Sequence, residues 1–86
     1  MEYLTRAIEI IGSQAELARR INVQPQAVTN WLNGKNMSPE SAAAIERETG
    51  GKVRADQLVP TVEFVRAKGK ITGYHVKIGG DDRKAA

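Results

Sequence analysis

Two helical patterns in this chain are separated by only three residues, and this short connection restricts the fold more than any other feature. In residues 14–21, QAELARRI, apolar side chains turn to one side and charged side chains to the other. Ser13 is placed to cap this helix, and Pro25 begins the next one, because proline is favoured at the first helical position. Two helices joined by such a turn predict a compact helix-turn-helix unit.

Further helices are predicted on both sides of this unit. Apolar residues at spacings of three and four predict a first helix over residues 4–11. Ser38 followed by Pro39 repeats the capping serine and the helix-starting proline, so a helix is expected over residues 39–49. Residues 53–59 add a short helical turn. The N-terminal part is therefore expected to be mainly α, with four to five helices.

The outer face of the helix over residues 25–33 is polar but uncharged. Residues 21–33 contain no Asp, Glu, Lys or Arg, although these residues make up 27% of the chain. One stripe of the helical wheel is apolar and includes Trp31, whose inward position favours a core role over stacking on a base. The opposite stripe consists of Gln26, Thr29, Asn30 and Asn33. Amides and hydroxyls match the donors and acceptors of particular base edges, whereas a lysine would bind phosphate regardless of sequence, so this stripe predicts the reading of DNA bases.

After Pro60 the apolar pattern changes from helical to alternating, which predicts a β-hairpin over residues 62–78. A three-residue loop, residues 67–69, would place Val62 and Phe64 on the same face as Tyr74, Val76 and Ile78. In that register Arg66 lies opposite Lys70.

The same register places Val65 opposite Ile71 on the other face of the ribbon. An isolated hairpin is marginal in water, so the hairpin is expected to pack on the helices or on a second subunit. The apolar pair Val65 and Ile71 is therefore a candidate dimer interface.

The helix-turn-helix residues are similar to those of a known family. Residues 14–33, QAELARRINVQPQAVTNWLN, resemble the helix-turn-helix of the Cro and phage-repressor superfamily, and GSQAELARR with PQAVTNWLNGK is especially similar to its YdaS-like, Cro-like prophage regulators. The resemblance covers roughly residues 4–60. It departs at Asn22, where the family often has glycine, and at Pro25, where many members have a base-contacting side chain. It implies a lambda-repressor-like domain followed by the C-terminal β-hairpin.

The resemblance also implies which residues meet DNA. Base contacts are implied for Gln24, Gln26, Thr29, Asn30 and Asn33. Phosphate contacts are implied for Gln14, Lys35 and Asn36, and a helix start such as that at Gln14 also offers backbone N–H groups to a phosphate. Dimerisation through a C-terminal strand or ribbon is implied as well. Two modules about 34 Å apart would read a pseudo-palindromic operator.

The basic surplus of the chain lies in its C-terminal part. Residues 1–50 hold five cations and six anions, whereas residues 51–86 hold eight cations and four anions. The cations on and before the hairpin are Lys52, Arg54, Arg66, Lys68, Lys70 and Lys77. They either protect strand edges against aggregation or contact phosphates that flank the groove, and charge alone leaves both interpretations open.

Chemistry of other kinds is not indicated. The chain has no cysteine, and its only histidine, His75, is interpreted as a strand residue, so neither a metal site nor a cofactor is expected. No nucleophile, base and oxyanion donor come together in the sequence, so no enzyme is expected. No apolar run approaches the roughly 18 residues of a membrane span, and no secretion leader is visible, so the expected compartment is the cytoplasm.

These observations predict a sequence-specific, DNA-binding transcriptional regulator, a Cro-like repressor of a prophage or prophage-like locus that acts as a homodimer. The predicted organisation is a DNA-binding domain in residues 1–60, the hairpin in residues 61–79 and a flexible tail in residues 80–86. Two other roles stay open. One is an antitoxin-type regulator with a cognate toxin as its partner, and the other is a protein-binding adaptor that uses the hairpin.

Overall fold

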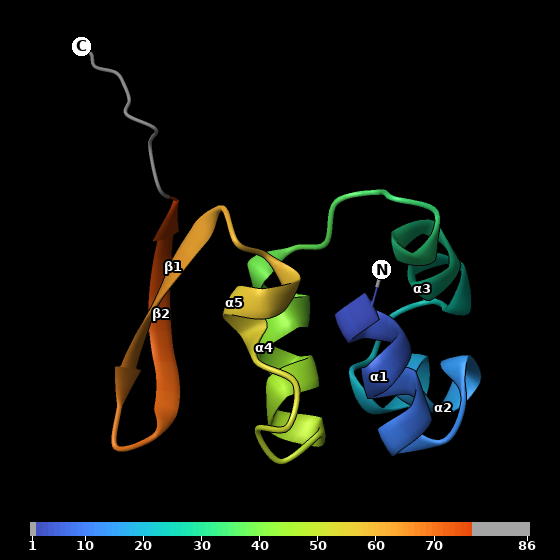
Figure 1. Cartoon of the computed structure of the whole chain (residues 1–86), viewed down its shortest axis with the longest axis horizontal. Coiled ribbons are helices and arrows are strands. Elements are labelled where there is room, and N and C mark those ends of the chain that lie inside the picture. The colour runs from blue at the N-terminus through green and yellow to red at the C-terminus, as the bar shows by residue number, and fades with distance from the viewer. Residues whose placement is uncertain (1, 77–86) are drawn as a thin grey trace, which may run out of the picture.

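Five helices followed by a two-stranded antiparallel hairpin make up residues 2–76, the part of the chain that the computed structural model describes (Figure 1). The elements are α1 (Glu2–Ile11), α2 (Gln14–Arg20), α3 (Pro25–Leu32), α4 (Pro39–Glu48), α5 (Ala55–Leu58), β1 (Val62–Ala67) and β2 (Lys70–Val76). The mainly α fold with a C-terminal hairpin is thereby confirmed. Lys77, Ile78 and the predicted tail over residues 80–86 lie outside the described residues. None of the helices in residues 2–76 is long and apolar enough to cross a membrane.

The elements are arranged along the long axis of the molecule. In Figure 1, α1, α2 and α3 gather at one end, α4 and α5 occupy the middle, and the hairpin stands beside α4 and α5 at the other end. The extents along the principal axes are 44, 32 and 20 Å. This arrangement separates α3 from the hairpin by the width of the α4 and α5 layer.

The helices begin where local capping groups allow them to begin. The Ser13 hydroxyl accepts a hydrogen bond from the Glu16 backbone N–H at 3.1 Å, and the Ser38 hydroxyl accepts one from the Ser41 N–H at 3.2 Å. Both predicted serine caps are confirmed, and each satisfies an N–H that has no partner within its helix. Prolines occupy the start of α3 and α4, as the sequence predicts.

The turn between α2 and α3 is closed by the backbone of α2. Asn22 adopts a φ of 61°, and its N–H donates to the Arg19 carbonyl at 3.3 Å. The Val23 N–H donates to the Ala18 carbonyl at 2.9 Å, and the Val23 side chain packs against the core. These two bonds form a Schellman motif, in which asparagine takes the left-handed position that glycine usually occupies.

One core runs through all five helices and into the hairpin. Its buried members include Leu4 and Ala7 of α1, Leu17 and Ala18 of α2, Val28 and Trp31 of α3, Ala42 and Ile45 of α4, Leu58 of α5 and Val62 of β1. Trp31 is only 6% exposed, so its predicted core role is confirmed. Ala15, predicted on the buried face of α2, is exposed because it lies about 200° around the helix from Leu17 at 100° per residue.

The hairpin register differs from the predicted one. Val62 pairs with Val76 and Phe64 with Tyr74, so these apolar residues share a face as expected. The loop, however, has two residues, Lys68 and Gly69, with positive φ angles of 54° and 80°. This is the pattern of a type I′ turn, whose twist matches that of the flanking strands.

A β-bulge in β2 takes the place of the third loop residue, because Thr72 has no pairing partner in β1. Arg66 pairs with Ile71 and Val65 pairs with Gly73, so the register shifts between Val65 and Arg66. The predicted pairs of Arg66 with Lys70 and of Val65 with Ile71 are therefore wrong. The bulge puts Val62, Phe64, Tyr74 and Val76 on one face, as a three-residue loop would have done.

A buried carboxylate fastens the hairpin to the helices. Glu46 of α4 is 8% exposed, and its carboxylate accepts two hydrogen bonds from the Arg66 guanidinium, one of them at 2.9 Å. It also accepts the Ala55 N–H at the start of α5 at 2.8 Å. The bonds from Arg66 are the main reason that the pKa of Glu46 is lowered from its ordinary value. A second tie joins the elements at the other end of α4, where the Tyr74 hydroxyl donates to the Glu40 carboxylate at 2.6 Å.

Replacing Lys68 by asparagine should stabilise the fold. Lys68→Asn puts the residue that favours type I′ turns at a position whose φ is 54°, so we expect a gain of about 0.5–1 kcal/mol in the free energy of unfolding. Urea denaturation followed by circular dichroism measures it. Lys52→Asn is the matched control, because it removes the same charge at a position without positive φ. Equal effects of the two substitutions would contradict the turn assignment.

Removing the charge of Glu46 should weaken the fold in a pH-dependent manner. Glu46→Gln should lower the free energy of unfolding at pH 7 by about 1–2 kcal/mol, because charge-assisted bonds to Arg66 and Ala55 are lost. Folding lowers the pKa of Glu46 below its ordinary 4.5, so the stabilisation is present above pH 4.5 and is lost as the pH falls through the lowered pKa.

The difference between wild type and Glu46→Gln should therefore shrink in acid. Urea melts at pH 7 and pH 3 measure it, with Glu48→Gln as the control, since Glu48 makes only a surface pair with Arg47. The same difference at both pH values would refute the role given to the Glu46 carboxylate.

Candidate nucleic-acid interface

The outer face of α3 presents amides and a hydroxyl above a buried apolar face. Val28 and Trp31 are buried beneath it and fix the orientation of the helix on α1 and α2. Gln24, Gln26 and Asn33 are exposed, whereas Thr29 and Asn30 are half-buried. The structure thus brings together the five residues predicted to contact bases on one end of the molecule. No charged side chain interrupts them between residues 24 and 33.

Gln26 and Asn30 are joined by a hydrogen bond. The Gln26 side-chain N–H donates to the Asn30 side-chain oxygen at 3.1 Å, one helical turn along α3. An amide has two donors and two acceptor lone pairs, so each side chain keeps free groups on its outward side. The pair therefore presents a fixed array of donors and acceptors, which suits bidentate contact with the N6 and N7 atoms of adenine.

The start and the end of α3 determine the surroundings of the remaining side chains of the stripe. Gln24 occupies the position before Pro25, and its side chain makes no capping bond, so its amide faces solvent. The Thr29 hydroxyl donates to the Pro25 carbonyl at 3.4 Å and keeps its lone pairs as acceptors. At the other end the Lys35 N–H donates to the Asn30 carbonyl at 3.0 Å.

The residues predicted to contact phosphate flank α3 rather than lie on it. Lys35 and Asn36 are exposed just beyond the end of α3, and Gln14 is the exposed first residue of α2. Gly34, with a φ of 94°, makes the reversal that brings Lys35 back over the last turn of α3.

An ion-pair cluster on α2 was not predicted as part of this region. The Glu16 carboxylate binds Arg20 at 2.9 Å and also pairs with Arg19. Hydrogen bonds from Arg19 and then Arg20 lower the pKa of Glu16 to about 2, so it stays charged in all but strong acid. The spacing of three and four residues in ELARR could have indicated these pairs. Arg19, whose side chain is 71% exposed, keeps a cation at the surface of α2, five residues after Gln14.

The hairpin residues predicted for a dimer interface do not share one face. Val65 is 46% exposed, whereas Ile71 is half-buried and packs against the core. The bulge causes this difference, because it turns Ile71 to the same side as Arg66. The expectation of a shared apolar face is corrected accordingly, and only Val65 remains outside.

The basic residues of the C-terminal part have different roles. Arg66 is held by Glu46 and by Asp56, so its guanidinium is engaged within the protein. Arg54 lies 3.6 Å from the Glu46 carboxylate. Lys52, Lys68 and Lys70 are exposed, and none of them pairs with a carboxylate within residues 2–76. His75 is an exposed strand residue, as predicted, and it contacts the Glu63 carboxylate at 2.7 Å.

Comparison with known proteins agrees with this geometry. A model of the family described as bacterial toxin YdaS matches residues 4–66. The "Putative transcriptional regulator YdaS" of Escherichia coli is 35% identical over 60 residues, which are 69% of this chain and 61% of the relative. The chain thus matches less than two thirds of the length of that relative.

A solved structure is similar over most of the same region. The "Cro protein from putative prophage element Xfaso 1" of Xylella fastidiosa superposes with a TM-score of 0.65 and is 33% identical, covering 70% of this chain and 92% of the Cro chain. The mainly helical fold of this chain is thus similar to a Cro-type helix-turn-helix fold. The sequence match over residues 4–66 shows that this chain belongs to the YdaS family.

Proposed function

We propose that this protein is a cytoplasmic, DNA-binding transcriptional regulator that reads base edges in the major groove with α3. The observation that carries the proposal is the uncharged face of α3, with its hydrogen-bonded Gln26 and Asn30. A solvated surface helix normally carries charge, whereas a base-reading helix needs donors and acceptors that discriminate between bases. The name of the Escherichia coli relative supports a regulatory role, and the fold of the Xylella fastidiosa Cro protein supports a repressor of a prophage locus.

In this proposal the base contacts come from Gln24, Gln26, Thr29, Asn30 and Asn33. Phosphate contacts come from Gln14, Lys35 and Asn36. The side chains of the polar stripe read the bases, and the flanking residues fix the register on the duplex. Phosphate contacts position a protein, whereas base contacts specify its site.

Two copies act together in this proposal. The two strands of the hairpin each leave one edge unpaired, and Val65 and Val76 are exposed at 46% and 62%. Pairing of two hairpins along these edges would satisfy the unpaired backbone groups, and two α3 helices about 34 Å apart would read a pseudo-palindromic operator.

The family description favours a second role. The matching family is described as a bacterial toxin, so a toxin–antitoxin pair is the alternative setting. The proposed DNA binding by α3 would make this chain the antitoxin of that pair. Co-expression with each neighbouring gene, followed by affinity purification, separates the two roles. A neighbour that arrests growth alone and co-purifies with this chain would establish the antitoxin role, and its absence would favour a free-standing repressor.

Selection from randomised duplex DNA tests the main proposal directly. The purified chain should enrich a two-fold symmetric motif at near-physiological salt, with half-sites one helical turn apart. The Gln26→Ala, Asn30→Ala double variant should lose the motif while it still binds DNA weakly. Enrichment of no motif would overturn base reading by α3, and an asymmetric motif would overturn the dimer.

Single substitutions of Gln26 and Asn30 should each weaken binding to the selected site by roughly 1–3 kcal/mol and leave nonspecific binding unchanged. Because the two side chains are hydrogen-bonded, the loss in the double variant should be smaller than the sum of the single losses. Fluorescence anisotropy on specific and scrambled duplexes measures both effects. Gln57→Ala is the control, since it removes an exposed amide from α5 instead. Equal losses on both duplexes would argue against base contact.

Lys35→Ala should act differently, through charge. Loss of one phosphate contact should weaken binding to every sequence alike and should make the slope of log K against log salt shallower by about one unit. Lys52→Ala removes the same charge from the loop after α4 and should leave the slope unchanged. Titrations at several salt concentrations measure both slopes, and identical slopes for the two variants would place Lys35 away from DNA.

A further inference from the structure

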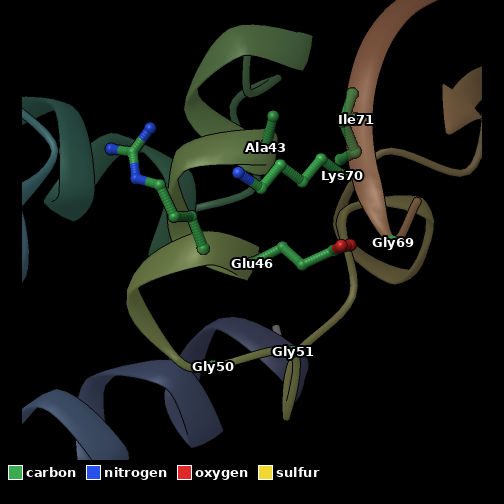
Figure 2. A pocket seen from close by; sticks show the side chains of 8 residues that line it. Ala43, Glu46, Gly50, Gly51, Gly69, Lys70 and Ile71 are labelled. Carbon is green, nitrogen blue, oxygen red and sulfur yellow. The ribbon is translucent and has the colours of Figure 1, made fainter. Parts of the chain in front are cut away.

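A pocket of about 440 Å³ opens between the C-terminal half of α4 and the turn of the hairpin (Figure 2). Its size falls within the range of roughly 300–1,000 Å³ that is usual for ligand-binding pockets. None of its lining residues belongs to α2 or α3. Figure 1 shows α3 and the hairpin at opposite ends of the long axis, so an occupant of this pocket would leave α3 free.

The interior of the pocket is apolar and has little side-chain cover. Ala43 of α4 and Ile71 of β2 contribute the aliphatic surface. The rest of the lining includes backbone without side chains, at Gly50, Gly51 and Gly69. Apart from each glycine and its two chain neighbours, no heavy atom lies within 4 Å of the position that a Cβ would take there. An aliphatic or aromatic side chain can therefore lie against these residues and remove apolar surface from water.

The charge around this interior is positive. Lys70 reaches from the hairpin across the pocket toward α4 (Figure 2), and it has no carboxylate partner within residues 2–76. Arg47 also lines the pocket, with its side chain 69% exposed and one surface contact to Glu48 at 3.3 Å. Lys52 and Lys68 adjoin the lining glycines in the sequence and are also exposed.

The acidic residue of the lining does not cancel this charge. The Glu46 carboxylate points toward the hairpin in Figure 2 and is bound by Arg66 and by the Ala55 N–H. Its charge is thus already matched, so it does not neutralise Lys70, and Arg47 has only its surface contact with Glu48.

We propose that this pocket binds an acidic segment of a partner protein. One aliphatic or aromatic side chain of the segment fills the space against Ala43 and Ile71, and Asp or Glu residues on either side of it pair with Lys70 and Arg47. A nucleic acid is the other polyanion to consider, but its phosphates would leave the apolar interior uncovered. Aromatic and aliphatic anchors in a pocket with a charged rim are the usual form of a binding hot spot. The inference does not depend on the proposed reading of DNA by α3.

Selection from a phage-displayed library of random twelve-residue peptides tests this proposal on the full chain. The expected result is enrichment of peptides that carry one large apolar residue between Asp or Glu residues. A synthetic peptide of that sequence should bind at least ten-fold more weakly to Lys70→Glu and to Arg47→Glu. Lys35→Glu is the matched control, because it reverses a charge away from the pocket and should leave peptide affinity unchanged.

Two further measurements keep the result interpretable. Ala43→Leu fills the pocket without a change of charge, so it should also reduce peptide binding at least ten-fold. In NMR spectra the peptide should shift the amide signals of Gly50, Gly51, Gly69 and Ile71, while those of Gln26 and Asn30 stay in place.

Several outcomes would overturn the proposal. The first is a peptide selection that enriches no sequence. The second is unchanged affinity for a peptide whose apolar residue is replaced by serine. The third is a set of peptide-induced amide shifts confined to α3. If a scrambled DNA duplex displaces the peptide and shifts the same four amide signals, the surface binds nucleic acid instead. None of these outcomes bears on base reading by α3, which the DNA selection tests separately.

Discussion

The orientation of α3 depends on the left-handed backbone of a single residue, Asn22. Its φ of 61° lets the chain reverse within three residues, so that the N–H groups of Asn22 and Val23 both return to carbonyls of α2. A β-branched residue at this position would be strained, whereas asparagine tolerates the left-handed region. Val23 then packs on the core and Pro25 starts α3 at once. The burial of Val28 and Trp31, and the outward direction of the polar stripe, follow from this turn.

The position of the hairpin depends on the Glu46 carboxylate instead. A charged group at 8% exposure is costly unless it is paired, and here it is matched by Arg66 and by the N–H of Ala55. The same carboxylate thereby joins α4, α5 and β1. Because Arg66 and the Ala55 N–H already bind this carboxylate, it does not neutralise Lys70, which lines the pocket beside it.

These two constraints divide the molecule into two surfaces of different chemistry. The end formed by α3 offers uncharged hydrogen-bonding groups, and the arginines of the adjacent α2 are partly neutralised by Glu16. The end formed by α4 and the hairpin offers unpaired lysines around an apolar hollow. Under the proposed function, the first end gains its specificity by matching bases, while the flanking residues contact phosphate. The second end carries the exposed Lys68 and Lys70, and α4 and α5 separate it from the first.

The sequence by itself determined the helices, their caps and the faces they bury. Ser13, Ser38 and Pro25 act on backbone groups within four residues, and the helical period alone places Trp31 inward and Asn30 outward. Such signals are local, so they can be read without knowledge of the fold. They identified most of the candidate DNA-binding residues for the same reason, since those residues share one helix.

Only the tertiary structure decided the hairpin register, the role of Arg66 and the pocket. A three-residue loop and a two-residue loop with a bulge both place Val62, Phe64, Tyr74 and Val76 on one face, so the sequence pattern could not choose between them. Arg66 meets a carboxylate twenty residues away, and the pocket is formed by α4 and the hairpin turn. These features arise from contacts between elements distant in the chain, and the periodicity of any one element carries no information about which side chains another element will bring to it.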